Sequence, residues 1–132
     1  MRPTSARILV VDDFPLFRQL VRSILVGNPT VQIVGDASDG LEAVQKVLEL
    51  TPDLILMDIR LPSLSGIEAA RQIRKLVPHS KIIFVSQESS AEVVQEVMNL
   101  GASGHVLKAY AGTDLLAAVK DVLLGKKFVS SA

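Results

Sequence analysis

The sequence predicts an α/β fold in which a five-stranded parallel sheet, with strand order 2-1-3-4-5, carries helices on both faces. Three observations lead to this fold class. Short runs rich in Val, Ile and Leu recur with little polar alternation, as in strands that are buried on both faces. Segments with apolar residues at helical spacing follow these runs, so strand and helix alternate five times. Glycine, proline and aspartate mark the turns between them.

The first three strands are predicted over residues 8–11, 31–34 and 54–57. The helix after the first strand starts near Pro15, because proline suits the first turn of a helix. Apolar residues that recur every three or four positions define the buried face of each helix. These are Phe17, Leu20, Val21 and Ile24 in the first helix, and Ala43, Val44, Val47 and Leu48 in the second.

The fourth strand is predicted over residues 82–85 and the fifth over residues 106–107, the shortest run. The fifth helix ends at Gly125, a residue typical of helix C-termini. Residues 6–125 are therefore expected to form one domain, and residues 126–132 a tail or the start of a linker. The buried faces of the last three helices are Ile67, Ala70 and Ile73, then Val93, Val94, Val97 and Met98, then Leu115, Val119, Val122 and Leu123.

Length and composition fit a single globular domain. The chain has 132 residues, of which 48% are hydrophobic and 21% charged. Its 14 basic and 14 acidic residues cancel, so it lacks the positive excess of a nucleic-acid-binding protein. The absence of cysteine excludes disulfides, thiolate metal sites and a cysteine nucleophile. No apolar run approaches the roughly 20 residues that span a membrane, and we expect a cytoplasmic protein.

Polar side chains follow four of the five predicted strands. Asp12 and Asp13 come after the first strand, Asp58 after the third, Ser86 ends the fourth and Lys108 follows the fifth. In an open parallel sheet, ligands bind beyond the carboxyl ends of the strands, and the order 2-1-3-4-5 makes the first and third strands neighbours. We therefore expect three carboxylates, a hydroxyl and an ammonium group to gather at one edge of the sheet.

Three adjacent carboxylates repel one another unless a cation compensates their charge. Oxygen ligands without His or Cys favour a hard ion, Mg²⁺ or Mn²⁺, and Mg²⁺ commonly shares its coordination with phosphate oxygens. A carboxylate can itself act as the nucleophile and form an aspartyl phosphate. The chain has no glycine-rich phosphate loop, so the pattern indicates phosphoryl chemistry without a nucleotide-binding motif.

Each of these residues, taken alone, also has a simple structural explanation. Asp13 is typical of a helix N-cap, Ser86 of a turn and Lys108 of a solvated surface charge. His105 has no second histidine or carboxylate motif beside it, which favours a buried structural role. The functional hypothesis depends on their shared position at the ends of successive strands.

At these residues the sequence resembles the receiver domain of two-component response regulators, a family with a CheY-like, flavodoxin-like fold. The resemblance covers about residues 6–125. Each motif alone is weak evidence, whereas their order and spacing together are specific. The motifs are residues 8–13 (ILVVDD), 52–58 (PDLILMD), 61–66 (LPSLSG), 85–86 (VS) and 101–108 (GASGHVLK).

The resemblance implies a phosphorylation site. Asp58 would accept a phosphoryl group from a phosphohistidine of a sensor histidine kinase, and Lys108 would pair with the phosphoryl oxygens. Asp13 and Asp58 would bind Mg²⁺, with Mn²⁺ as the alternative, together with the backbone carbonyl of Arg60. Asp12 would act mainly through a water. Such a domain is a signalling module and not an enzyme, with slow autodephosphorylation as a side activity.

The resemblance also implies a two-state switch in which the Ser86 hydroxyl moves to the phosphoryl group and the side chain at 105 swings inward. Several positions depart from the family pattern. His105 stands where Tyr or Phe is usual, and Ala109 stands where a cis proline is common. Gln87 replaces a small residue and would narrow access to the site, while Arg60 is long enough to contact the phosphoryl group or the attacking water.

Residues 114–130 resemble the last helix and linker of LuxR/NarL-type regulators. The resemblance implies a receiver cut from a transcription factor whose helix-turn-helix domain lies outside this sequence, so that DNA would be contacted only through that domain. A stand-alone receiver is the alternative. The resemblance to LuxR/NarL-type regulators also implies a homodimer on phosphorylation and no membrane partner.

Two other function classes are alternatives to a phosphorylated receiver. A pseudo-receiver would bind protein partners without phosphorylation, but the intact Asp58, Ser86 and Lys108 argue against it. A flavodoxin-like small-molecule binder or a metal-dependent phosphohydrolase is the other alternative. With one Tyr and no Trp, few residues could sandwich a flavin ring.

Overall fold

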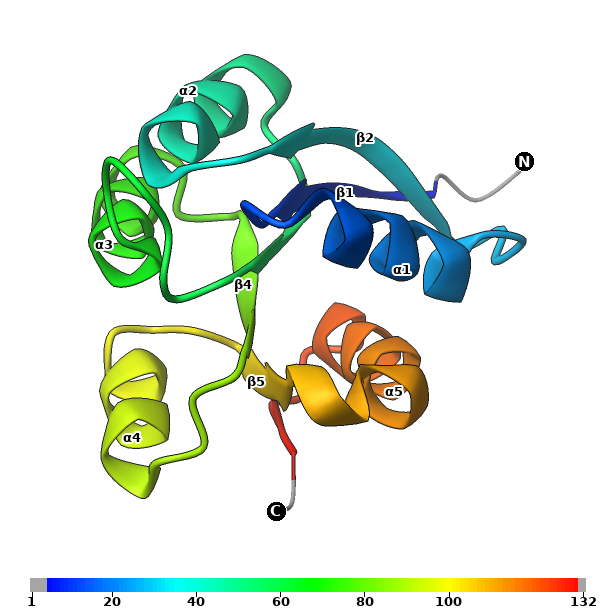
Figure 1. Ribbon diagram of the computed structural model, residues 1–132. Coiled ribbons are helices and arrows are strands. Elements are labelled where there is room, and N and C mark those ends of the chain that lie inside the picture. The colour runs from blue at the N-terminus through cyan, green and yellow to red at the C-terminus, as the bar shows by residue number, and fades with distance from the viewer. Residues whose placement is uncertain (1–4, 131–132) are drawn as a thin grey trace.

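The computed structural model describes residues 5–130 and shows one parallel sheet between two layers of helices (Figure 1). The sheet has six strands in the order β2-β1-β3-β4-β5-β6. Every neighbouring pair is parallel, which requires the alternation of strand and helix predicted above. The strands are β1 (Ala6–Val11), β2 (Val31–Ala37), β3 (Leu54–Met57), β4 (Lys81–Ser86), β5 (Gly104–Leu107) and β6 (Phe128–Val129).

The predicted order of the first five strands is present, but the prediction of a five-stranded sheet is wrong. Residues 126–132, expected as a tail or the start of a linker, contain β6, and residues 131–132 lie outside the described part of the chain. β6 pairs with β5 through the partners Gly104–Phe128 and His105–Val129. A strand of two residues carries no periodicity, so this strand is specified by its tertiary pairing and not by its local sequence.

The first four helices begin where the local sequence provides a cap or a proline. Asp39, Ser65 and Ser90 each accept a hydrogen bond from the backbone amide three residues later. Pro15 opens the first helix, which has no side-chain cap. No helix within residues 5–130 is long and apolar enough to cross a membrane. The helices are α1 (Pro15–Leu25), α2 (Gly40–Leu50), α3 (Gly66–Leu76), α4 (Ala91–Asn99) and α5 (Ala111–Leu123), with a 3₁₀ turn (Lys108–Tyr110) before α5.

Alternate residues of the buried strands face two separate cores. Ile8 and Val10 of β1 pack with α1 and α5 on one face, whereas Leu9 and Val11 pack with α2 and α3 on the other. Figure 1 shows the same division, with α1 and α5 on the right and α2, α3 and α4 on the left. Leu20 and Leu48, predicted on buried helix faces, are instead 44% and 52% exposed. The adjacent residues Val21 and Val47, predicted on the same helix faces, are buried instead.

Candidate functional site

The ladder between β1 and β3 brings two aspartates to the same edge of the sheet. Val11 and Met57, the last residues of these strands, are register partners. The next residue on each strand is an aspartate, and the Asp58 amide donates a 3.0 Å hydrogen bond to the Val11 carbonyl. Asp12 and Asp58 therefore leave adjacent strand ends side by side. This adjacency follows directly from parallel pairing with both strands ending at the same level.

Asp12, Asp13 and Asp58 form one acidic group. Each offers a carboxylate oxygen, and these three oxygens all lie within 4.8 Å of one another. Asp12 and Asp58 are buried, at 2% and 8% exposure, while Asp13 faces solvent. An oxygen-only set with one solvent-facing ligand fits a hard divalent cation that retains water, such as Mg²⁺.

The ammonium group of Lys108 lies against two of these carboxylates. Its Nζ is 2.8 Å from Asp12 Oδ2 and 2.9 Å from Asp58 Oδ2. The Phe17 ring of α1 lies beneath it, with Nζ 4.6 Å from the ring centroid, a cation–π contact. The side chain is only 12% exposed, so the simple explanation of Lys108 as a solvated surface charge is wrong. One ammonium cannot balance three carboxylates, which leaves negative charge for a cation to compensate.

Burial and charge shift the pKa values of this pair. Burial raises the pKa of Asp58 above 3.8, its ordinary value, and the nearby Asp12 charge adds to this, while the hydrogen bond and charge of Lys108 oppose it. Burial alone would lower the pKa of Lys108, but hydrogen bonds to Asp12 and Asp58 outweigh it and raise the pKa. The ammonium therefore stays charged, whereas the folded protein disfavours the ionised form of Asp58 relative to a solvent-exposed aspartate.

Local backbone contacts fix the positions of the aspartates. Asp58 Oδ1 accepts a 2.7 Å hydrogen bond from the Ile59 amide, so both carboxylate oxygens are held. Asp12 Oδ1 accepts from the Phe14 amide at 2.9 Å. Asp13 does not cap α1, because the N-cap residue is Phe14 and no side chain caps this helix. The explanation of Asp13 as a helix cap is therefore wrong.

Gly66 supports the loop that follows Asp58. Its amide donates a 2.7 Å hydrogen bond to the Ile59 carbonyl, and a Cβ built at this position would lie 2.0 Å from the Asp58 carbonyl oxygen. Only glycine allows the start of α3 to approach Asp58 so closely. The Ser65-Gly66 pair belongs to the motifs quoted above, but the sequence alone did not indicate this contact. Phe17 was likewise predicted only as a core residue.

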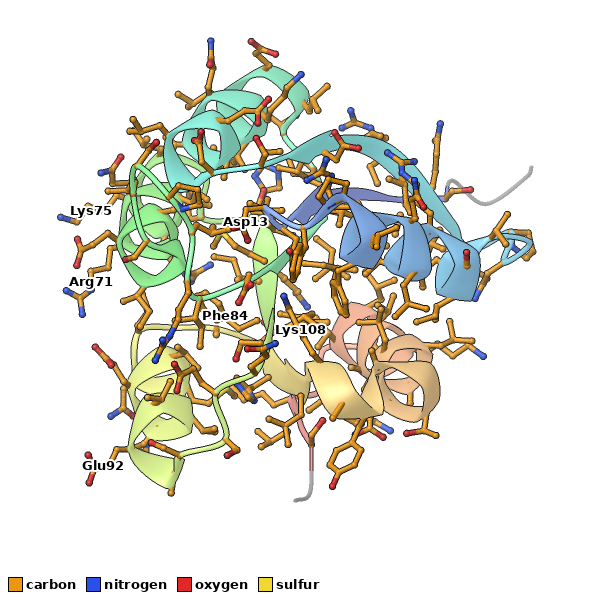
Figure 2. The ribbon with its side chains drawn as sticks, viewed as in Figure 1. Asp13, Arg71, Lys75, Phe84, Glu92 and Lys108 are labelled. Carbon is orange, nitrogen blue, oxygen red and sulfur yellow. The ribbon has the colours of Figure 1, made fainter. Side chains whose placement is uncertain are left out.

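The acidic group opens into a hollow of about 430 Å³. Asp13 and Lys108 both line it, and Figure 2 labels them near the middle of the molecule. Arg60 is exposed at the rim, and its Nε donates a 2.6 Å hydrogen bond to Glu88 Oε1. The guanidinium predicted to reach a phosphoryl group is thus paired with a carboxylate. The lining residues are Asp13, Phe14, Asp58, Arg60, Gln87, Glu88 and Lys108.

Ser86 and His105 are brought together beside this hollow. Ser86 Oγ lies 3.1 Å from His105 Nε2 and accepts a 3.2 Å hydrogen bond from the Glu88 amide. Both residues are fully buried, so the imidazole already points inward. Burial lowers the pKa of His105, against a smaller opposing effect of the Glu88 backbone, and favours a neutral ring. The Lys108–Ala109 peptide is trans, so Ala109 does not reproduce a cis proline.

A larger groove of about 1010 Å³ lies between α3 and α4. Figure 2 labels Arg71 and Lys75 on one wall and Glu92 on the other. Arg71 in this groove pairs with Glu96 across it at 3.6 Å and with Glu68 of its own helix at 3.2 Å. The acidic group and the buried ammonium lie at the sheet edge instead, and the chemistry belongs there.

Residues 8–120 match the family model described as the response regulator receiver domain. The transcriptional regulatory protein DegU of Brevibacillus brevis is 37% identical over 123 residues, which cover 93% of this chain and 52% of DegU. The nitrate/nitrite response regulator protein NarL of Escherichia coli K12 is 32% identical over 127 residues, which cover 96% of this chain and 59% of NarL. The chain thus spans between half and two thirds of these relatives' lengths.

The fold is also similar to solved structures. The signal receiver domain of the response regulator NarL from Mycobacterium tuberculosis superposes with a TM-score of 0.88 at 31% identity. The match covers 94% of this chain and 100% of that domain. A LuxR-family response regulator from an Aurantimonas species superposes with a TM-score of 0.89 at 33% identity, covering 95% of this chain and 89% of that one.

Proposed function

Because the chain belongs to the response regulator receiver domain family, we propose that Asp58 accepts a phosphoryl group from a phosphohistidine of a sensor histidine kinase. The observation that carries this proposal is the Asp58 carboxylate, held 2.9 Å from the Lys108 ammonium and grouped with two further carboxylates. In this proposal the nucleophile lies beside a fixed positive charge and opens into a solvent-accessible hollow, which supports attack on a phosphoryl group.

In the proposed transfer, an Asp58 carboxylate oxygen attacks phosphorus, the P–O bond forms and the P–N bond to the donor imidazole breaks. The electron pair of the broken bond returns to the imidazole, which takes up a proton. Lys108 holds the charge of the phosphoryl oxygens, and the Ile59 amide orients the carboxylate through Oδ1. Positioning and charge compensation account for the role of these side chains.

Asp13, Asp58 and the Arg60 backbone carbonyl are the proposed direct ligands of Mg²⁺, with Mn²⁺ as the alternative, and Asp12 would act mainly through a water. When bound, the cation compensates the negative charge of the carboxylates and of the transferring phosphoryl group. The exposed Asp13 leaves room on the solvent side for water ligands. Burial and then the nearby Asp12 charge raise the pKa of Asp58, and a bound cation would offset both effects.

The proposed output is a change of conformation that begins at Ser86 and His105. The hydroxyl must leave the imidazole to hydrogen-bond a phosphoryl oxygen on Asp58. We extend the proposal to control of transcription in the cytoplasm through a helix-turn-helix domain outside this sequence, with dimerisation on phosphorylation. In this proposal residues 6–125 are the receiver domain. Its activity is that of a phosphoacceptor with slow autodephosphorylation, not of an enzyme.

The function is tested by incubating the protein with acetyl phosphate and Mg²⁺ and recording its intact mass. We expect a gain of one phosphoryl group that is lost on mild base treatment and maps to Asp58, because acyl phosphates are base-labile. EDTA should suppress the gain. An unchanged mass, both with acetyl phosphate and with a cognate kinase, would contradict the proposal and favour a phosphorylation-independent module.

Replacing Lys108 by glutamine is expected to slow phosphorylation on the order of 100-fold, because the ammonium that faces Asp58 is lost from the site. The rate of mass gain with acetyl phosphate measures this effect. Lys126→Gln, which changes an exposed lysine after α5, is the matched control and should phosphorylate at the parent rate. Equal rates for Lys108→Gln and the parent would exclude Lys108 from the transfer.

A further inference from the structure

The C-terminal strand is hydrogen-bonded to the same residue that holds the Ser86 hydroxyl. The His105 imidazole is 1% exposed, and its Nε2 lies 3.1 Å from Ser86 Oγ. The backbone carbonyl of His105 accepts a 2.9 Å hydrogen bond from the Ser130 amide. His105 of β5 therefore contacts the Ser86 hydroxyl through its side chain and, through its backbone, the residue that follows β6.

The Ser130 side chain strengthens this connection. Its Oγ accepts a 3.1 Å hydrogen bond from the Leu107 amide and donates a 2.8 Å hydrogen bond to Asp114 Oδ2 of α5. Ser130 is thus attached to β5 at two backbone positions and to α5 at one carboxylate. Leu107 directly precedes Lys108, whose ammonium contacts Asp58. The attachment points of Ser130 on β5, His105 and Leu107, therefore lie three residues and one residue before Lys108 in the sequence.

β6 is the element of the sheet most easily displaced. It has two residues, lies at the edge of the sheet and pairs on one side only. Val129 is 45% exposed, and only Phe128 of the two residues packs against the core around α5. A short edge strand opens locally at low free energy, and each of its few hydrogen bonds is a large part of what keeps it closed. We therefore expect a small change at His105 to shift the equilibrium between the paired and the open state of β6.

We propose that β6 reads the phosphorylation state of Asp58 through His105, a coupling that rests on the proposed function. When the Ser86 hydroxyl turns to a phosphoryl oxygen, His105 Nε2 loses its partner. An unpaired polar atom in the core is unfavourable, so the imidazole reorients. The backbone of His105 shifts with it, the hydrogen bond from the Ser130 amide weakens, and β6 opens more often. Phosphorylation thereby loosens the C-terminal segment from β5 and α5.

The coupling is tested first in the unphosphorylated protein, with a double-mutant cycle of Ser86→Ala and His105→Phe. Amide hydrogen exchange at Ser130, resolved by NMR, is the measurement. Ser86→Ala removes the partner of the imidazole and should speed Ser130 exchange roughly fivefold, the equivalent of one hydrogen bond. In the His105→Phe background, the same substitution should leave the exchange rate unchanged. Ser86→Ala effects of equal size in both backgrounds, or no effect in the parent, would overturn the proposal.

Amides of β2, the opposite edge strand, report whether each variant keeps its fold. Where their protection is lost in His105→Phe, the smaller His105→Leu takes its place in the cycle. The second arm compares the parent protein before and after acetyl phosphate, with the mass gain recorded on the same sample. Faster Ser130 exchange in the phosphorylated protein supports the coupling. A full mass gain with unchanged Ser130 exchange overturns it while leaving the proposed function intact, and the absence of any mass gain counts against the function itself.

Discussion

Asp58→Asn is expected to abolish the phosphoryl mass gain with acetyl phosphate, because the amide cannot act as the nucleophile. The remaining gain should fall below the detection limit, since within residues 5–130 no other carboxylate contacts both Lys108 and the Ile59 amide. Asp12, the other partner of Lys108, is buried and holds the Phe14 amide. Intact mass after a fixed incubation is the measurement.

The same substitution is expected to make the fold more stable in metal-free buffer at neutral pH. The pKa of Asp58 is raised by burial, so the folded protein loses stability as the pH rises through the interval from the ordinary value of 3.8 to the raised one. The neutral amide has no such loss. The advantage of Asp58→Asn over the parent should therefore be largest at neutral pH and shrink below the ordinary carboxyl pKa. Thermal unfolding at several pH values measures it.

The combination of lost phosphorylation and retained or increased stability separates a missing nucleophile from a misfolded protein. Asp36→Asn is the matched control, because Asp36 lies on β2 and pairs with Arg22 near the surface. It should keep the full mass gain. A full gain in Asp58→Asn would show that a different residue accepts the phosphoryl group.

Gly66→Ala is expected to lower the free energy of unfolding by roughly 3 kcal/mol, the upper range for inserting a group into a tightly packed site. The new Cβ would lie 2.0 Å from the Asp58 carbonyl oxygen, and backbone atoms cannot move aside as a flexible side chain can. Relief requires α3 or the loop after Asp58 to shift. Urea unfolding measures the change in stability, and acetyl phosphate should phosphorylate the variant more slowly, because the shift displaces Asp58.

Gly112→Ala is the matched control for this prediction. Gly112 lies in α5, and a Cβ at this position meets no atom within 4 Å. Alanine is the better helix former, so this variant should gain up to about 1 kcal/mol. If both variants unfolded at the same urea concentration as the parent, Gly66 would not be a packing requirement of the site.

Much of the fold and the centre of the site could be predicted from local patterns. The runs before Asp12 and Asp58 are apolar throughout, which indicates strands buried on both faces. Once such strands alternate with helices, parallel pairing is nearly obligatory, and the residues after the strands must meet at one edge. The gathering of Asp12, Asp13 and Asp58 was therefore predictable without coordinates.

The tertiary structure decided the contacts that depend on segments far apart in the chain. β6 forms only because Phe128 and Val129 pair with the free edge of β5, since two residues are too few to show a hydrophobic periodicity. Gly66 matters because α3 approaches the Asp58 carbonyl, a distance that no spacing encodes. Leu20 and Leu48 have helical spacing like their buried neighbours, yet the neighbouring elements leave them exposed.

The sequence by itself determined the alternation of strands and helices, the family resemblance and the identity of the acidic residues, because burial periodicity and strand ends are properties of short segments. Only the tertiary structure decided that Phe17 lies beneath Lys108, that Ser86 is bonded to His105, and that Ser130 attaches the C-terminal strand to β5. These contacts depend on side-chain orientation and on packing between elements, which are fixed only when the whole chain is folded.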